Sequence, residues 1–211
     1  MGAVMVAEAQ EHLTESTGPA TPDNWMYPPE DGWTYDQVRE LVLPYAWELL
    51  GGKIVVRGAT KWWHDLVRDE LYYRLRSARR EPFAVNTERW IKLDERNAPR
   101  PDVVVFDKRG LDVQTLDCIP AEKVALAIEV VSPGSRSEDR ILKPGLYAAA
   151  GIENFWRVER SEEGLPEVHE FWLDEEAAVY VPATARKVHT AKLAVDEPFP
   201  VEIDLRGLVE A

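Results

Sequence analysis

The chain has 211 residues, 45% of them apolar and 30% charged, and a formal net charge of −13. This length allows one domain with a sizeable core, and no apolar run reaches the roughly 18 residues that a membrane helix needs. The single cysteine, Cys118, excludes an internal disulfide framework and a multi-cysteine zinc site, and the acidic charge argues against sequence-blind electrostatic binding to nucleic acid.

Residues 1–32 contain many Pro, Thr, Glu and Gly residues and show no sustained periodicity. This composition predicts a loosely ordered N-terminal lead-in. Residues 1–21 also lack the basic start and the long apolar run of a secretory signal, so we expect a cytoplasmic protein. No internal repeat or later boundary is visible, and residues 33–211 are therefore expected to form a single domain.

Apolar periodicity and turn residues predict the elements in chain order. Thr34 and Gln37 fit a capping box, and the Gly51-Gly52 pair predicts a turn. The expected elements are helices over 34–43, 60–80 and 137–150, and strands over 53–57, 83–93, 101–106, 124–131, 154–158 and 167–173. Buried central strands between helices predict an α/β or α+β fold with a central mixed sheet.

Two carboxylates interrupt or begin the most apolar strands. Asp102 begins the segment PDVVV and Glu129 lies within AIEVVS. A carboxylate in a buried strand is costly unless it is paired or binds a metal, although Asp102 could also simply begin a strand after Pro101. If the two strands are antiparallel neighbours, the acids converge and can hold Mg²⁺ for phosphodiester hydrolysis.

Asp139 and Lys143 follow on the next predicted helix at positions i and i+4, which lie on the same helix face. Taken alone, such a pair is most often a surface salt bridge. Beside two buried acids, the lysine could instead stabilise the charge that develops on a phosphate.

Several segments together resemble the Uma-two family, which is described as restriction endonucleases of the PD-(D/E)XK nuclease superfamily. The resemblance covers residues 35–175, and its most informative motifs lie between Pro101 and Trp156. The matching segments are ELLGGKIVV from Glu48, then His64, PDVVV from Pro101, IEVVSP from Ile128, Asp139-x3-Lys143-x3-Tyr147-x3-Gly151-Ile152, and Phe155-Trp156.

The resemblance implies a restriction-endonuclease-like fold, a central mixed sheet flanked by helices, with Mg²⁺ or Mn²⁺ bound by Asp102 and Glu129. The usual superfamily lysine would fall at position 131, which is Val131 here, and the family pattern places it at Lys143 instead. A supporting glutamate is expected on the first helical segment, where Glu48 is the candidate. Pro144 and Gly145 directly follow Lys143, so the helix could bend or restart there.

Three further residues have both a functional and a structural interpretation. His64 could contact a phosphate or a metal-bound water, or it could be a satisfied, half-buried histidine. Ser132 could contact substrate, although capping of the following turn is the commoner role. Lys61, just before the second predicted helix, could contact substrate or be an ordinary solvated side chain.

The leading hypothesis is a Mg²⁺-dependent endonuclease acting on DNA. The alternatives are a catalytically silent nuclease-fold binding or assembly module, and a hydrolase of another phosphate-containing substrate. Residues 53–100 carry 12 Lys and Arg against 7 Asp and Glu, so this section is basic while the remainder of the chain is acidic. It contains or adjoins the candidate DNA contacts, which are Arg57, Lys61, Arg68, Arg89, Lys92 and Lys143.

We also expect a homodimer. The segment 167–173 alternates strictly and is predicted to be an edge or half-exposed strand, which would leave apolar surface to cover. Cleavage of both DNA strands would suit a two-fold dimer.

Overall fold

The computed structural model describes residues 18–132, 134, 137–183 and 188–210. The first half contains α1 (Tyr35–Val38), β1 (Trp47–Leu50), β2 (Lys53–Val56), α2 (Trp62–Ala78), β3 (Phe83–Thr87), β4 (Trp90–Lys92), β5 (Val103–Asp107) and β6 (Cys118–Pro120). The second half contains β7 (Val124–Val130), the π-helical turn η2 (Glu138–Leu142), α3 (Lys143–Ala149), β8 (Asn154–Arg160), β9 (Pro166–Asp174), β10 (Val179–Pro182), β11 (Lys192–Val195) and β12 (Val201–Asp204). Short 3₁₀ turns, η1 (Ala121–Lys123) and η3 (Arg206–Leu208), complete the set.

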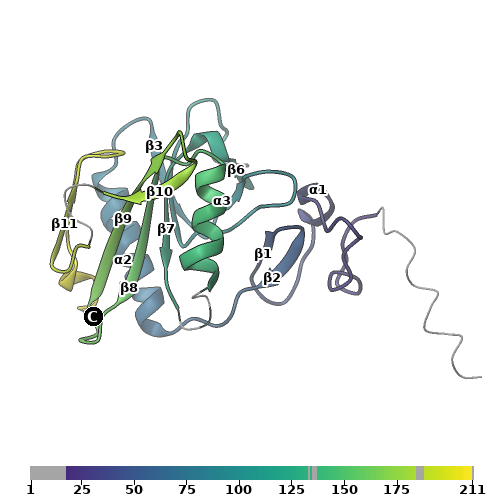
Figure 1. Cartoon of the computed structure of the whole chain (residues 1–211), viewed down its shortest axis with the longest axis horizontal. Helices are drawn as coiled ribbons and strands as arrows, with labels where there is room; N and C mark the ends of the chain where they lie inside the picture. Colours follow the sequence, from purple (N-terminus) through teal and green to yellow (C-terminus); the bar gives the residue numbers. More distant parts are fainter. Residues whose placement is uncertain (1–17, 133, 135–136, 184–187, 211) are drawn as a thin grey trace, which may run out of the picture.

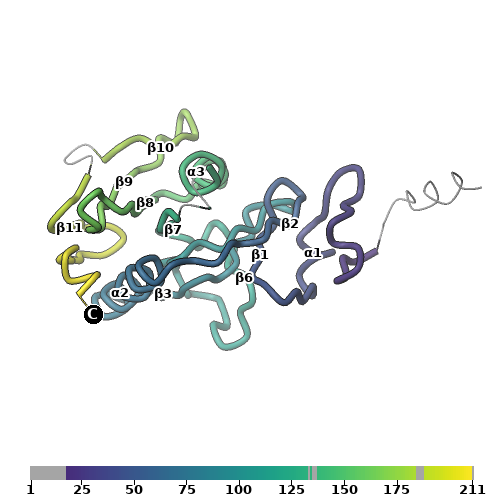
Figure 2. The backbone as a smooth tube through the Cα atoms, turned by 90° about the horizontal axis from the view of Figure 1, so that it is seen from below, coloured from purple at the N-terminus to yellow at the C-terminus, as the bar shows by residue number. Residues whose placement is uncertain are grey.

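A six-stranded sheet in the order β10-β9-β8-β7-β5-β3 forms the centre of the molecule. Its pairs are antiparallel except for β7 and β8, which run parallel and are joined by η2 and α3. Helices α2 and α3 cover opposite faces of the sheet (Figures 1 and 2). The predicted mixed sheet with flanking helices is confirmed. None of the helices in the described ranges is long and apolar enough to cross a membrane.

Alternation along the central strands divides the apolar core between the two faces. Val103 and Val105 of β5 pack with α2, whereas Val104 and Phe106 pack with Tyr147 of α3. On β7, Leu126, Ile128 and Val130 likewise join the α2 side, whereas Ala127 and, beyond a register shift, Val124 join the α3 side. Because side chains on a strand alternate with period two, Glu129 has the parity of the α3 face. Asp102, next to Val103, has the parity of Val104 and therefore also belongs to this face.

Three predicted elements need correction. Glu48 lies on strand β1 instead of a helix, because the first helix ends at Val38. The single strand expected over 83–93 is broken into β3 and β4 at Glu88, whose backbone adopts a φ of +48°. Residues 167–173 fall within β9, whose alternating burial confirms the half-exposed alternative, whereas its pairing with both β8 and β10 shows that the edge-strand alternative is wrong.

The described part of the N-terminal lead-in, residues 18–32, contacts the β1–β2 hairpin. Trp33 is fully buried, and its indole N–H donates to the carbonyl of Trp25 at 3.0 Å. The hairpin turns through Gly51 and Gly52, which both have positive φ, as a two-residue turn requires. The predicted capping box between Thr34 and Gln37 is present at the start of α1.

Gly52 and Gly32 make the closest approach between these two segments, and this contact leads to a stability prediction. A Cβ on Gly52, at φ +72°, would lie 2.9 Å from the Cα of Gly32. We therefore expect Gly52→Ala to lower the free energy of unfolding by more than the roughly 1–2 kcal/mol of left-handed strain alone.

Chemical denaturation would measure this loss. Gly145→Ala is the control, because Gly145 lies in α3 without a positive φ, and a Cβ there would have no atom within 4 Å. That change should stabilise the protein by about 0.5–1 kcal/mol. Equal stability of wild type and Gly52→Ala would contradict the account of the contact.

Candidate active site

Seven charged side chains meet near the start of β5 and the end of β7. The N-terminal ends of α2 and α3 lie at the same end of the sheet (Figure 1). We call them the carboxylate network. It contains four carboxylates, Glu48, Asp102, Glu129 and Asp139, and three basic groups, Arg57, His64 and Lys143. All except Arg57 are at most 4% exposed, and the Arg57 side chain is 14% exposed. Such burial of charge is sustained only by pairing or by a bound cation.

Glu129 points from β7 towards α3. Tyr147 donates its hydroxyl to one carboxylate oxygen of Glu129 at 2.6 Å. The Lys143 ammonium lies 3.2 Å from the same oxygen and 3.3 Å from the other. Lys143 and Tyr147 are four residues apart on α3, so one helix face holds both oxygens of Glu129.

Lys143 is the centre of the network on this side. Besides Glu129, its Nζ lies 3.1 Å from Glu48 Oε1 and 3.2 Å from Asp139 Oδ1. Asp139 belongs to the π-helical turn η2, which passes directly into α3 with Pro144 in its first turn. The pair Asp139–Lys143 is therefore a buried ion pair and not the surface salt bridge that its spacing alone favours. Single π-helical turns are often found at functional sites.

Asp102 connects the strand ends to α2 and β2. Its Oδ2 accepts the backbone N–H of Val130 at 2.7 Å, which fixes the carboxylate beside the residue that follows Glu129. Val103 pairs with Ile128, so the antiparallel register brings Asp102 opposite Glu129, as the sequence predicted. The other oxygen accepts from Arg57 at 2.8 Å, and His64 Nε2 lies 3.3 Å from Oδ2.

The buried acids and bases shift one another's proton affinity. Burial raises the pKa of Glu129 well above its ordinary value, and Asp139, Asp102 and Glu48 add to the rise against the opposing charge of Lys143. Burial would lower the pKa of Lys143, but the charges of Glu129, Glu48 and Asp139 raise it above its ordinary value. These shifts favour the charged form of Lys143 and the neutral form of Glu129.

Asp102 and His64 shift in different directions, the pKa of Asp102 downward and the pKa of His64 upward. Burial would raise the pKa of Asp102, but the hydrogen bond from His64 and the charges of His64 and Arg57 hold it below its ordinary value. Burial would lower the pKa of His64, yet its contacts with Asp102 and Asp65 raise it overall. These shifts favour the anionic form of Asp102 and the protonated form of His64.

The network has an excess of acid. Its four carboxylates face two permanent cations, Arg57 and Lys143, and one histidine. Within the described ranges no three His, Cys, Asp or Glu residues are arranged to hold a metal ion together. The Lys143 ammonium lies between Glu48, Glu129 and Asp139. The donor set itself is made of hard carboxylate oxygens, which fit Mg²⁺ or Mn²⁺.

The structure brings together the five residues proposed as catalytic from the sequence, and also Asp139, the predicted helix partner of Lys143. The five are Glu48, His64, Asp102, Glu129 and Lys143. Glu48 joins through β1, since its Oε2 also accepts the backbone N–H of Arg100 at 3.0 Å. Ser132 is half-buried just beyond the end of β7, and Lys61 is an exposed residue at the N-cap of α2. These two residues do not belong to the buried network.

Three of the candidate DNA contacts are engaged within the protein. Arg57 pairs with Asp102 and Glu88, and Lys143 is enclosed by acids. Arg68 contacts the carboxylates of Asp65, Asp69 and Glu88. Lys61, Arg89 and Lys92 have no carboxylate within salt-bridge distance among the described residues, and Lys92 lies 5.1 Å from the Tyr35 ring centroid.

Sequence reasoning did not assign Arg57 or Tyr147 to the site itself. Tyr147 could have been found, because Asp139, Lys143 and Tyr147 recur every four residues and therefore share one helix face. Arg57 lies 45 positions before its partner Asp102, and no local pattern links residues so far apart.

Comparison with known proteins agrees with this architecture. The family model Uma2, described as "Putative restriction endonuclease", matches residues 35–205. No curated protein matches the chain. The crystal structure of a "putative nuclease belonging to DUF820" from Anabaena variabilis is similar with a TM-score of 0.57 and 16% identity, covering 83% of this chain and 96% of that one. This similarity shows a shared fold, and the family match shows that the chain belongs to the Uma2 restriction-endonuclease family.

Proposed function

We propose that this protein is a Mg²⁺-dependent endonuclease that hydrolyses phosphodiester bonds in DNA. The observation that carries the proposal is the buried excess of carboxylate at the ends of β5 and β7, with an ammonium held among the acids. A divalent cation would neutralise this excess, and hydrolysis of a phosphodiester requires such a cation or an equivalent charge. Membership of the family supports a nuclease over other phosphate hydrolases.

Each network residue has a role in this proposal. Asp102 and Glu129 would hold the magnesium ion, and Glu48 would support them. The bound ion supplies an activated water and neutralises charge on the phosphate. Lys143 keeps a positive charge beside the reacting phosphate, where it stabilises the negative charge that develops on the phosphate oxygens. His64, which contacts Asp102 and Asp65, orients Asp102 and in this proposal would contact a phosphate oxygen.

One observation favours the alternative of a catalytically silent nuclease-fold binding module. Lys143 already lies within 3.1–3.2 Å of three carboxylates, so much of the buried charge is satisfied without a metal. In that case the network would be a structural element, and the fold would survive without cleavage. Hydrolysis of another phosphate-containing substrate would use the same residues. A comparison of cleavage of DNA with cleavage of other phosphate esters would distinguish it from the endonuclease.

Metal binding separates the first two possibilities. We expect calorimetric titration of the wild-type chain with Mg²⁺ or Mn²⁺ to show saturable binding, because one divalent cation offsets the excess negative charge of the network. Asp102→Asn should abolish this binding. Glu170→Gln is the control, since Glu170 is a buried sheet acid that pairs with His189 outside the network. A flat titration of the wild type would favour the silent module.

We further propose that the protein forms a homodimer. The edge strand β10 exposes Val179 and Val181, which are 50% and 39% exposed, and its outer backbone groups have no strand partner in the described sheet. Light scattering should give twice the chain mass of 24.0 kDa at micromolar concentration. Val181→Lys should shift the mass towards the monomer, and a monomer mass for the wild type at all concentrations would contradict the proposal.

A further inference from the structure

A cleft of about 480 Å³ lies next to the carboxylate network but outside it. Its walls come from α1, β1, the β3–β4 loop and the segment before β5. Ten residues line it, and three of them are arginines: Arg39, Arg89 and Arg100. Trp47 and Trp90, which meet edge to face at 4.5 Å, form part of its apolar lining.

Two of these arginines have no acidic partner in the described part of the chain. Arg89 uses one guanidinium nitrogen to bind the carbonyl of Leu116 at 3.2 Å. Arg100 uses its Nε to bind the carbonyl of Glu88 at 3.0 Å, and its guanidinium lies 5.9 Å from the Trp90 ring centroid. Among the described residues neither has a carboxylate within salt-bridge distance, so most of their N–H donors remain available.

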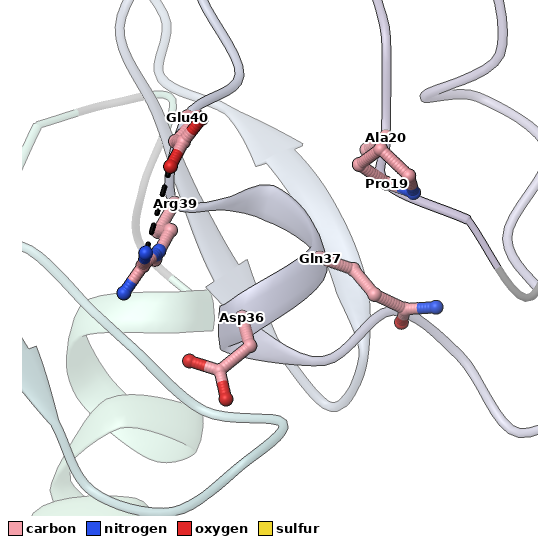
Figure 3. A pocket seen from close by; sticks show the side chains of 6 residues that line it. All are labelled: Pro19, Ala20, Asp36, Gln37, Arg39 and Glu40. Atoms are coloured by element: carbon pink, nitrogen blue, oxygen red, sulfur yellow. Dashed lines mark ion pairs between the residues drawn. The ribbon is translucent and has the colours of Figure 1, made fainter.

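The acidic residues near the cleft compensate this charge only in part. Glu88 lines the cleft, but its carboxylate already binds Arg57 and Arg68. Arg39 pairs with Glu40 on the adjoining surface, where Figure 3 shows the two side chains facing each other. Asp117 is exposed at the wall. Arg89 and Arg100 therefore keep a local positive charge in a protein of net charge −13.

The cleft is connected to the network through direct bonds. The backbone N–H of Arg100 donates to Glu48, and Asp102 follows two residues later. Glu88 bridges from the other side, because Arg57 binds both Glu88 and Asp102. Glu88 also adopts a left-handed φ of +48°, a strained conformation of the kind that persists at binding sites. The cleft and the network therefore share the segments that carry Glu88 and Arg100.

We propose that this cleft is a phosphate-binding subsite, in which Arg89 and Arg100 bind a phosphodiester of the DNA backbone that flanks the bond at the carboxylate network. The inference rests on the proposed function for the identity of the polymer. Planar guanidinium groups bind two phosphate oxygens at once, which gives orientation as well as charge. Such a subsite explains how an acidic protein holds DNA, since the contact is local and does not depend on the overall charge.

Binding of labelled duplexes in Ca²⁺ at increasing KCl, followed by fluorescence anisotropy, tests the subsite. Arg89→Gln and Arg100→Gln should each weaken binding to the same extent for unrelated DNA sequences. Each should also make the slope of log K against log [KCl] less steep by about 0.9, the value for one lost phosphate contact. Arg76→Gln is the matched control, because Arg76 is an exposed arginine near the C-terminal end of α2 without a carboxylate partner among the described residues. Arg89 is the more secure variant, since the Arg100 guanidinium also lies over the Trp90 ring and its loss would disturb that contact.

The outcomes separate this inference from the proposed function. A lowered slope in Arg89→Gln, with the wild-type slope in Arg76→Gln, supports the subsite even if no DNA is cleaved. A slope in both cleft variants equal to that of wild type overturns the subsite even if cleavage occurs. A wild-type protein that binds no duplex in Ca²⁺ at low salt overturns both proposals.

Discussion

Glu129→Gln is expected to abolish Mg²⁺-dependent DNA cleavage while leaving the fold nearly unchanged. The amide has almost the same volume as the carboxylate and can still accept the Tyr147 hydroxyl, but it removes a ligand charge. Removal of one acid from a network with excess acid also relieves repulsion, so the midpoint of thermal unfolding should remain close to that of wild type. Single-turnover cleavage of a plasmid or duplex, measured in Mg²⁺ and in chelator, gives the rate.

Glu170→Gln is the control for this experiment as well. It replaces a buried glutamate of the same sheet, on β9, outside the carboxylate network. Full activity in Glu170→Gln together with no activity in Glu129→Gln would assign the loss to the network. Cleavage by Glu129→Gln at the wild-type rate would show that Glu129 is not a metal ligand.

Lys143→Ala is expected to have two effects. If Lys143 stabilises charge on the phosphate, the single-turnover rate at saturating Mg²⁺ should fall by about 10²–10³-fold. The fold should also lose stability, because Glu48, Glu129 and Asp139 would lose their common partner. Removal of one partner of a buried ion pair costs roughly 3–5 kcal/mol.

The stability effect depends on divalent metal. Without Lys143 the network has one more uncompensated negative charge, so a divalent cation should bind more tightly and raise the unfolding midpoint of the variant more than that of wild type. Lys143→Met separates the loss of charge from the loss of volume, and Lys192→Ala, at an exposed residue on β11, is the surface control. A variant as active as wild type would refute the role of Lys143 in catalysis.

The sheet and its acids could be predicted because their signals are local. The runs PDVVV and AIEVV predict buried strands, and their antiparallel register places Asp102 opposite Glu129. The i, i+4 spacing put Asp139 and Lys143 on one helix face. The strands and the shared helix face need only period and neighbours in sequence, whereas the antiparallel pairing of the two strands was a condition that the fold supplies.

The remaining features depend on contacts between distant residues. Glu48 was expected on a helix, but the β1–β2 hairpin carries it to the network, where it meets Lys143 and the backbone of Arg100. The 167–173 segment alternates like an edge strand, yet β10 pairs with it after a turn that the sequence did not reveal. Arg57 looked like a free basic residue, and only the fold shows its pairing with Asp102. Spacing along the chain contains no information on these pairings.

Anomalous diffraction from crystals soaked in Mn²⁺ tests the central claim most directly. The account predicts one Mn²⁺ peak in contact with carboxylate oxygens of both Asp102 and Glu129, which suit this cation as they suit Mg²⁺, and no such peak in Asp102→Asn crystals. Absence of a peak at the ends of β5 and β7 in the wild type, with the Lys143 ammonium still between Glu48, Glu129 and Asp139, would contradict it.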